Sequence, residues 1–161
     1  MYGRKEVEQY LNGLGIEYHI VDHPAAWTTE DADKYIEGME GIASKTLLMA
    51  GRKDRKFYMF IMDEKKMLDL KKLGEITQDR LHFAKEEYIQ SKLGLVPGVV
   101  SLFGLLNNEE HDIAVFVDKE VLNERIITFH PNVNTGTLFM SVEDMFKVLK
   151  DLGYNCQVLD L

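Results

Sequence analysis

A single lysine stands at the start of an apolar run in residues 41–49, which read Gly-Ile-Ala-Ser-Lys-Thr-Leu-Leu-Met. Lysine is an unusual neighbour for a buried strand face, so Lys45 has two interpretations. Its long methylene stem can carry the ammonium past the apolar strand into water. Alternatively, the cation points into a pocket, where it can hold a phosphate or polarise an ester carbonyl. The residues around Lys45 leave both interpretations open.

Two further segments could border such a pocket. Residues 93–108 contain three glycines and a proline ahead of Asn107 and Asn108. Glycine lets the backbone approach a ligand closely and offer it N–H donors, although a loop followed by a strand and a turn is equally consistent with this composition. Residues 129–135 place His130, two asparagines and a threonine beside a proline. That segment is either a structural turn or the polar edge of a site.

Composition limits which partners are possible. The chain has 161 residues, of which 45% are hydrophobic and 29% charged, and its formal net charge is -8. This charge argues against a protein that grips DNA or RNA by overall electrostatics, so any RNA contact must be local. The one cysteine, Cys156, excludes an internal disulfide and a multi-cysteine zinc site, as in a reducing cytosol. Because no apolar stretch approaches a membrane span, we expect a cytoplasmic protein without a membrane partner.

Helix and strand patterns alternate irregularly along the chain, which predicts a single α+β domain over residues 1–161. Two strands are expected to form a hairpin whose polar connection, residues 51–56, is strongly basic. Periodicity and capping residues predict helices over 7–14, 28–38, 68–73, 86–93 and 141–153. Strand patterns lie at 18–21, 45–50, 57–63, 81–83, 99–106, 113–118, 126–129, 137–140 and 156–159.

In this order the segments resemble the family of prolyl-tRNA editing proteins, which comprises the YbaK and prolyl-tRNA synthetase-associated editing domains. The likeness spans nearly the whole chain, from the helix that ends in residues 11–18 to the segment at 129–134. The pattern Leu-Gly-x-x-Pro-Gly-x-Val-Ser at 93–101, followed by Phe-His-Pro-x-x-Asn at 129–134, is most similar to the stand-alone enzymes that clear alanine from proline tRNA.

The resemblance implies a mixed sheet that forms a partly open barrel with surrounding helices. It also implies water attack on the aminoacyl ester at the acceptor end of proline tRNA, with alanine as the expected amino acid and without a cofactor or metal. Prolyl-tRNA synthetase is a further candidate partner, and the oligomeric state stays open. The catalytic residues would be Lys45, Gly98 and His130. The substrate-binding residues would be Trp27, Ile42, Leu47, Val100, Ser101, Leu102, Phe103 and Asn134. The candidates for RNA contact are Arg52, Lys53, Arg55 and Lys56, with Lys71 and Lys72 as a second cluster.

Two departures from the family pattern keep an alternative open. The resemblance implies that residues 98–102 form a glycine loop beside the substrate, and Leu102 stands where that loop usually ends in proline. Asn108 stands where the family commonly has aspartate. Both features would suit a non-catalytic module of the same fold that senses an amino acid or an aminoacyl-tRNA. A metal hydrolase is a third hypothesis, because His19 and His23 are four residues apart. That spacing pairs ligands only on a helix, and this segment is expected to be extended.

Overall fold

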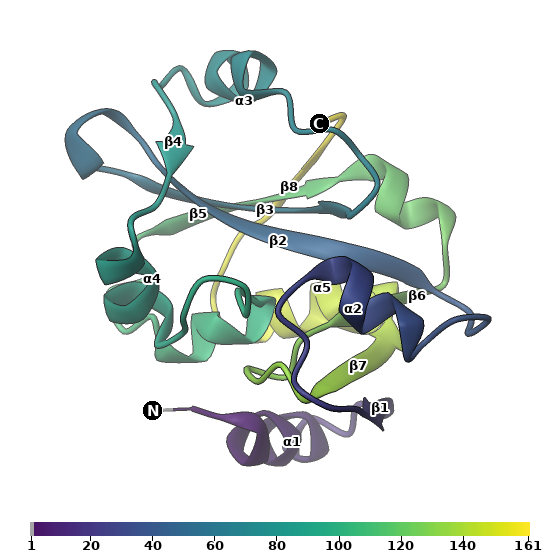
Figure 1. Ribbon diagram of the computed structural model, residues 1–161. Helices are drawn as coiled ribbons and strands as arrows, with labels where there is room; N and C mark the ends of the chain where they lie inside the picture. Colours follow the sequence, from purple (N-terminus) through teal and green to yellow (C-terminus); the bar gives the residue numbers. More distant parts are fainter. Residues whose placement is uncertain (1) are drawn as a thin grey trace.

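The computed structural model describes residues 2–161, apart from the side chain of Thr29. Its centre is an eight-stranded mixed sheet in the order β1-β7-β6-β2-β3-β5-β8, with β4 paired to β2 (Figure 1). The order ends at β1 and at β8, so the sheet is not closed into a barrel. The predicted single α+β fold with a mixed, partly open sheet and surrounding helices is confirmed. The strands are β1 (Tyr18–Asp22), β2 (Ile42–Ala50), β3 (Phe57–Asp63), β4 (His82–Phe83), β5 (Ile113–Asp118), β6 (Ile126–Phe129), β7 (Gly136–Ser141) and β8 (Gln157–Leu159).

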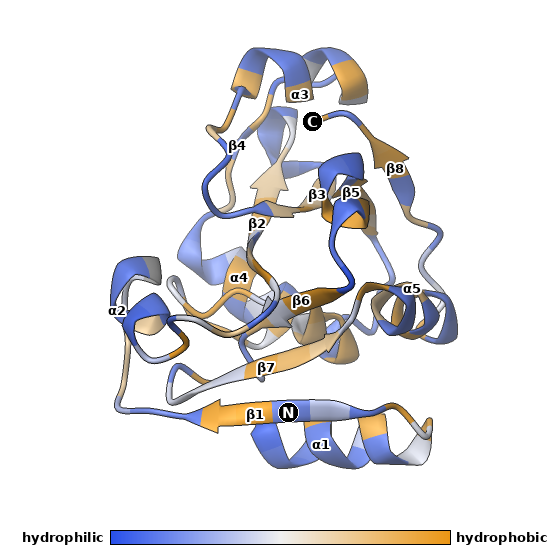
Figure 2. Cartoon of the chain, turned by 90° about the vertical axis from the view of Figure 1, so that its right-hand side faces the viewer, coloured by the Kyte–Doolittle hydropathy of each residue, from blue (hydrophilic) through white to orange (hydrophobic). Residues whose placement is uncertain are grey.

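Helices cover both sides of the central strands. The α-helix α3 lies on one side of β2 and β3, and α4 and α5 lie on the other (Figure 1). Figure 2 shows that hydropathy follows this arrangement: hydrophobic residues lie along β6 inside the molecule, and hydrophilic stretches lie on the outer turns of α1 and α5. The α-helices are α1 (Arg4–Gly13), α2 (Thr29–Lys34), α3 (Leu70–Thr77), α4 (Glu86–Leu93) and α5 (Val142–Asp151), and the 3-10 helices are η1 (Arg52–Asp54), η2 (Leu102–Asn107) and η3 (Lys119–Asn123).

Strand β3 carries a continuous apolar run because both of its faces are buried. Side chains alternate across a strand, so Met59 and Ile61 pack into one hydrophobic cluster while Phe60 and Met62 pack into another. The first cluster joins α1, α4 and α5, and the second joins α3 through Leu73. The two clusters hold the sheet between the helical layers.

Strand β2 organises the region around Lys45. It pairs with β3 from Ser44 to Ala50, but its other edge is shared by two partners. That edge pairs in parallel with β6 only at residues 42–43 and with β4 only at residues 49–50. Between these partners, the edge of β2 over residues 44–47 pairs with no neighbouring strand in the part of the chain that the structure describes.

One element and several boundaries differ from the sequence predictions. Residues 99–106 are not a strand but a loop followed by η2, so that prediction was wrong. Short apolar runs fit a strand or a helical turn equally well, and here Ser101 decides by capping η2: its Oγ accepts a hydrogen bond from the Phe103 N–H at 3.2 Å. The predicted helix at 68–73 runs instead from Leu70 to Thr77, because Asp69 caps it by accepting from the Lys72 N–H at 3.1 Å.

The helix predicted at 28–38 is shorter than expected, although its start is confirmed. The Thr28 Oγ accepts a hydrogen bond from the Asp31 N–H at 3.1 Å, and α2 ends at Lys34. Across residues 2–161, no helix combines the length and apolar character that a bilayer crossing requires.

Candidate active site

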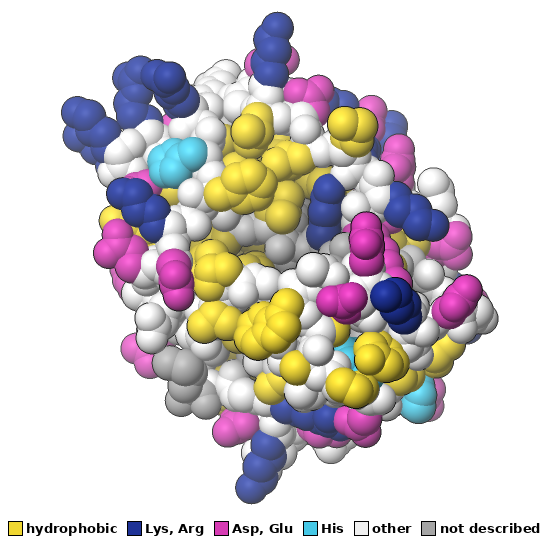
Figure 3. Space-filling view, in the orientation of Figure 1, with side chains coloured by type: hydrophobic (Ala, Val, Ile, Leu, Met, Phe, Trp, Pro, Cys, Tyr) yellow, Lys and Arg dark blue, Asp and Glu magenta, His cyan; other side chains and the backbone are white. Residues whose placement is uncertain are grey.

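A cavity of about 430 Å³ lies beside the unpaired edge of β2. Its lining comes from β2, from β4 and the residue after it, from α4, from residues 97–100, and from the end of β6 with the residue that follows. Figure 3 shows this face of the molecule hollowed, with hydrophobic side chains gathered around the hollow. The lining residues are Ser44, Lys45, Thr46, Leu47, Leu48, Phe83, Ala84, Ile89, Pro97, Gly98, Val100, Phe129 and His130.

The cavity brings together residues predicted from three separate segments of the chain. The three candidate catalytic residues, Lys45, Gly98 and His130, all line it, as do the candidate substrate contacts Leu47 and Val100. These residues lie far apart in the sequence and meet only because the glycine loop and the segment after β6 both close over β2.

Lys45 is partly buried on β2, and its Nζ donates a hydrogen bond to the backbone carbonyl of Lys66. Burial lowers the pKa of the Lys45 ammonium, while the nearby acidic residues Asp63 and Glu64 act in the opposite direction when ionised. A partly desolvated ammonium at a cavity wall interacts more strongly with a phosphate or a carbonyl oxygen than a solvated one does. Of the two interpretations of Lys45, the structure therefore favours a cation at a pocket.

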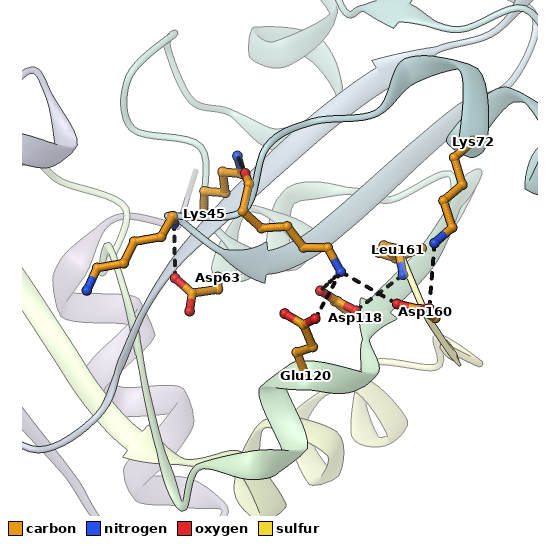
Figure 4. A network of polar contacts seen from close by, with 9 residues as sticks. Lys45, Asp63, Lys72, Asp118, Glu120, Asp160 and Leu161 are labelled. Atoms are coloured by element: carbon orange, nitrogen blue, oxygen red, sulfur yellow. Dashed lines mark hydrogen bonds and ion pairs between the residues drawn. The ribbon is translucent and has the colours of Figure 1, made fainter.

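The carbonyl that holds Lys45 belongs to a residue that is itself anchored by an ion-pair network (Figure 4). The Lys66 Nζ lies 2.8 Å from Asp118, whose side chain is fully buried, and 3.7 Å from Asp160. The backbone N–H of Leu161 donates to the second oxygen of Asp118 at 3.2 Å. This network fixes the segment after β3 against β5 and thereby positions the acceptor of Lys45.

His130 presents an unpaired ring nitrogen at the site. Its Nδ1 is buried and makes no hydrogen bond within residues 2–161. Burial, followed by the charge of His23, lowers the pKa of His130, so the imidazole is neutral near pH 7. The His130 carbonyl accepts a hydrogen bond from the Ser101 Oγ at 2.6 Å, which ties this segment to the glycine loop. A neutral imidazole held in this way can exchange hydrogen bonds with a substrate or a water.

The glycine loop offers backbone donors to the cavity. Gly98 has φ of 88°, a left-handed conformation that favours glycine over residues with a side chain. The N–H groups of Gly98 and Val100 have no acceptor in the described part of the chain, and both residues line the cavity. Backbone N–H groups without a protein acceptor can donate to an oxygen of a ligand.

Six of the predicted substrate contacts do not line the cavity. Leu102 and Phe103 are fully buried in the core, and Ile42 is also buried beside Ile127. Their apolar side chains turn inward because η2 and the start of β2 pack against the core rather than the cavity. Ser101 is buried, where it caps η2 and donates to the His130 carbonyl. Asn134 has a buried Nδ2 without a partner among residues 2–161. Trp27 is 63% exposed and lies over Gly98.

Asn108, the second departure from the family pattern, has a structural position outside the cavity. It is 3% exposed, and its Nδ2 donates to Asp112 at 3.0 Å while its Oδ1 accepts from the Tyr154 hydroxyl at 2.8 Å. An amide can satisfy both partners, whereas an aspartate here would face the Asp112 carboxylate. The missing carboxylate therefore removes nothing from the cavity.

Residues from β4 and α4 that line the cavity were not singled out from the sequence. Phe83, Ala84 and Ile89 reach it because β4 pairs with the far end of β2. A two-residue strand gives almost no periodic signal, so its partner is decided by tertiary structure.

A carboxyl pair was also missed. Asp33 of α2 and Glu64, just after β3, meet at a small cavity of about 30 Å³ that shares Ser44, Phe129 and His130 with the larger one. Burial, a hydrogen bond to Asp33 and the charges of Asp33 and Asp63 raise the pKa of Glu64 to about 8, against a weaker opposing effect of Lys65. Glu64 is thus protonated at pH 7 and links α2 to the end of β3.

The natural chain is expected to lose stability as the pH rises toward 8, and Glu64→Gln is expected to reduce that loss. In the unfolded chain the carboxyl ionises near its ordinary pKa of 4.5, and in the folded chain near 8, so the folded protein binds more protons between these values. The stability that Glu64 contributes is therefore full below pH 4.5 and is lost as the pH rises to 8. Urea unfolding at about pH 5 and about pH 8 should show a larger decline for the natural chain than for the variant. Equal declines would contradict the pairing with Asp33.

The hairpin tip carries the four predicted RNA-contact residues on its exposed surface. Arg52, Lys53, Arg55 and Lys56 follow directly on the end of β2. Figure 3 shows Lys and Arg side chains gathered on this corner of the molecule. Lys71 of the second cluster lines an open groove with Arg52, whereas Lys72 lies 3.7 Å from Asp160 and is paired.

The metal-hydrolase hypothesis requires His19 and His23 to lie on one helix, and the structure has no helix there. His19 lies on the extended strand β1, and His23 follows the strand with its Nε2 3.0 Å from the Thr137 Oγ1. Side chains four residues apart on an extended backbone are too distant to share an ion.

Comparison with known proteins identifies the family. Residues 23–148 match the family model of the aminoacyl-tRNA editing domain. A protein of Acetoanaerobium sticklandii named "Prolyl-tRNA editing protein ProX" is 33% identical, over 100% of this chain and 99% of that protein. Mouse "Prolyl-tRNA synthetase associated domain-containing protein 1" is 26% identical, over 98% of this chain and 95% of its own.

Among solved structures, a candidate trans-editing enzyme for prolyl tRNA synthetase superposes with a TM-score of 0.76 at 19% identity, covering 98% of this chain and 96% of its own. At that identity the superposition supports the fold alone. The family model and the ProX relative also show the family, because the model matches residues 23–148 and the relative is 33% identical over the whole chain. The chain belongs to the aminoacyl-tRNA editing domain family and is an editing enzyme, an aminoacyl-tRNA deacylase.

Proposed function

We propose that this enzyme hydrolyses mischarged proline tRNA in trans, with Ala-tRNA(Pro) as its preferred substrate. The observation that carries the proposal is the convergence of Lys45, Gly98, Val100 and His130 on one cavity. The names of the curated relatives, which refer to prolyl-tRNA editing and to prolyl-tRNA synthetase, support the choice of tRNA. A cytoplasmic location and association with the synthetase are further expectations of the same proposal.

In the proposed mechanism a water molecule attacks the carbonyl carbon of the aminoacyl ester. The backbone N–H groups of Gly98 and Val100 stabilise the oxyanion that forms. Lys45 holds either the phosphate of the terminal nucleotide or the ester oxygen, and His130 hydrogen-bonds to substrate or water. The C–O bond to the ribose then breaks, the ribose oxygen takes a proton, and free amino acid and tRNA leave. Positioning replaces a protein nucleophile in this scheme.

Selectivity in this proposal depends on the size of the cavity. Leu47, Ile89 and Val100 give the cavity apolar walls, and the proposed sieve requires that the side-chain subsite between them admit alanine and refuse a proline ring. Leu102, which replaces the family's proline at the end of the glycine loop, packs into the core and not into the cavity wall, since it is fully buried. It therefore affects the support of the loop and makes no direct contact with the amino acid.

A panel of proline tRNAs charged with alanine, serine, cysteine or proline tests the proposed function. We expect alanine to be released fastest and the prolyl ester to survive. Rapid release of proline would contradict the proposed selection by side-chain size. Binding of charged tRNA without release of any amino acid would instead favour the non-catalytic module that the Leu102 and Asn108 departures left open.

The basic tip is proposed to bind the tRNA backbone, which would explain how a chain with a net charge of -8 approaches RNA. Replacing Lys53 and Arg55 together with glutamate should weaken tRNA binding and flatten its salt dependence by roughly one log unit per log unit of salt for each phosphate that the variant no longer neutralises. Titrations across a salt series measure both effects. Lys147→Glu combined with Lys150→Glu, two charge reversals at exposed residues of α5, is the matched control. An unchanged salt slope in the tip variant would remove the tip from the interface.

A further inference from the structure

Phe83 is an exposed aromatic residue on a backbone that is held in place. It is 56% exposed, yet it lines the cavity. Its neighbours leave it little freedom, because Phe83 pairs with Met49 and the Ala84 N–H donates to the Leu48 carbonyl at 3.0 Å. A phenylalanine left in water forgoes the stabilisation that burial of its side chain would bring. Its fixed exposure at a cavity rim points to a ligand.

The ring stands on the same face of β2 as Lys45. Paired residues in an antiparallel sheet project to one side, and side chains on a strand alternate, so Phe83 shares a face with Met49, Leu47 and Lys45. At about 3.3 Å per residue, Phe83 lies roughly 13 Å along β2 from Lys45.

The same ring adjoins the basic tip. His82 precedes it, and the His82 Nε2 lies 2.7 Å from Asp54 of η1, while the Lys85 Nζ lies 3.4 Å from the same carboxylate. β4 is thus tied to the tip on both sides of Phe83. Along β2 the order is cavity, aromatic ring and cluster of cations, and Figure 3 shows hydrophobic side chains between the hollow and the Lys and Arg side chains of that corner.

We propose that Phe83 is a stacking platform for an unpaired base near the 3′ end of the RNA whose terminal ester enters the cavity. This inference rests on the proposed function. Aromatic rings bind bases of any sequence through their faces, and cations beside them hold the phosphates. At about 3.4 Å or more per nucleotide, the roughly 13 Å from Lys45 places that base within about four nucleotides of the ester. A single-stranded acceptor end presents such bases, whereas a base-paired stem does not.

The test uses an uncharged RNA hairpin with a single-stranded 3′ end, in which 2-aminopurine replaces one unpaired base at a time. Stacking on Phe83 should quench the fluorescence of one position. Phe83→Leu, which keeps an apolar side chain but no ring face, should abolish that quenching and weaken binding about 5- to 150-fold. Phe83→Tyr should retain both. Leu122→Ala, at a residue that is 51% exposed on η3, is the matched control.

Quenching and affinity that are unchanged in Phe83→Leu would overturn the inference, as would self-association of the natural chain that Phe83→Leu abolishes without any effect on RNA. The hairpin carries no ester, so this result is independent of the proposed reaction. Hydrolysis of Ala-tRNA without a Phe83 effect on binding would overturn only the stacking platform. Phe83-dependent quenching without hydrolysis would overturn only the reaction.

Discussion

Lys45→Ala is expected to lower kcat/KM for deacylation of Ala-tRNA(Pro) by at least about a hundredfold. The reason is that the variant removes a partly desolvated cation from the cavity, and loss of one preorganised electrostatic partner costs this much in other enzymes. The fold should survive, because the Lys45 Nζ makes its hydrogen bond to the Lys66 carbonyl at the cavity and not within the core. Rates measured on charged tRNA under single-turnover conditions, with thermal unfolding beside them, separate these effects.

Two further variants sharpen the Lys45 experiment. Lys45→Met keeps the apolar stem without the charge and should be as inactive as Lys45→Ala, which would show that the ammonium and not the packing is needed. Lys65→Ala removes a neighbouring exposed lysine and should leave the rate unchanged. Full turnover by Lys45→Met would rule out a role for the cation.

Lys66→Met is expected to produce the largest loss of stability among these variants, on the order of 3 kcal/mol. The substitution leaves the fully buried Asp118 without its ion-pair partner at 2.8 Å, and an uncompensated buried charge is costly. The backbone N–H of Leu161 remains as a donor to Asp118 and sets a limit to the loss. Urea unfolding at neutral pH measures the change in the free energy of unfolding.

A double variant distinguishes an uncompensated charge from lost packing. Lys66→Met combined with Asp118→Asn removes both charges while keeping an acceptor for Leu161, so most of the stability should return. If the double variant is as unstable as Lys66→Met alone, the methylene stem of Lys66 and not its charge supports the fold. Deacylation by the double variant also reports whether the network positions the carbonyl that holds Lys45.

Local patterns predicted most of the elements, because each depends on residues close together in the chain. The cap at Ser141 is one example: its Oγ accepts from the Asp144 N–H at 3.0 Å at the start of α5. Gly94 is another, since it ends α4 in the left-handed conformation that glycine adopts without strain. The long apolar run of β3 was also visible, although the burial of both of its faces follows from the helices packed on each side.

The sequence by itself therefore determined most of the elements and, through the family resemblance, the reaction class. It also singled out Lys45 as the first candidate catalytic residue. Tertiary structure decided which candidates share a cavity. Leu102 and Phe103 turned into the core because η2 is a helix, and Phe83 entered the rim because a two-residue strand pairs with the end of β2. Neither outcome has a local signal. The cavity exists because β6 and β4 pair with opposite ends of one strand edge and leave residues 44–47 open between them.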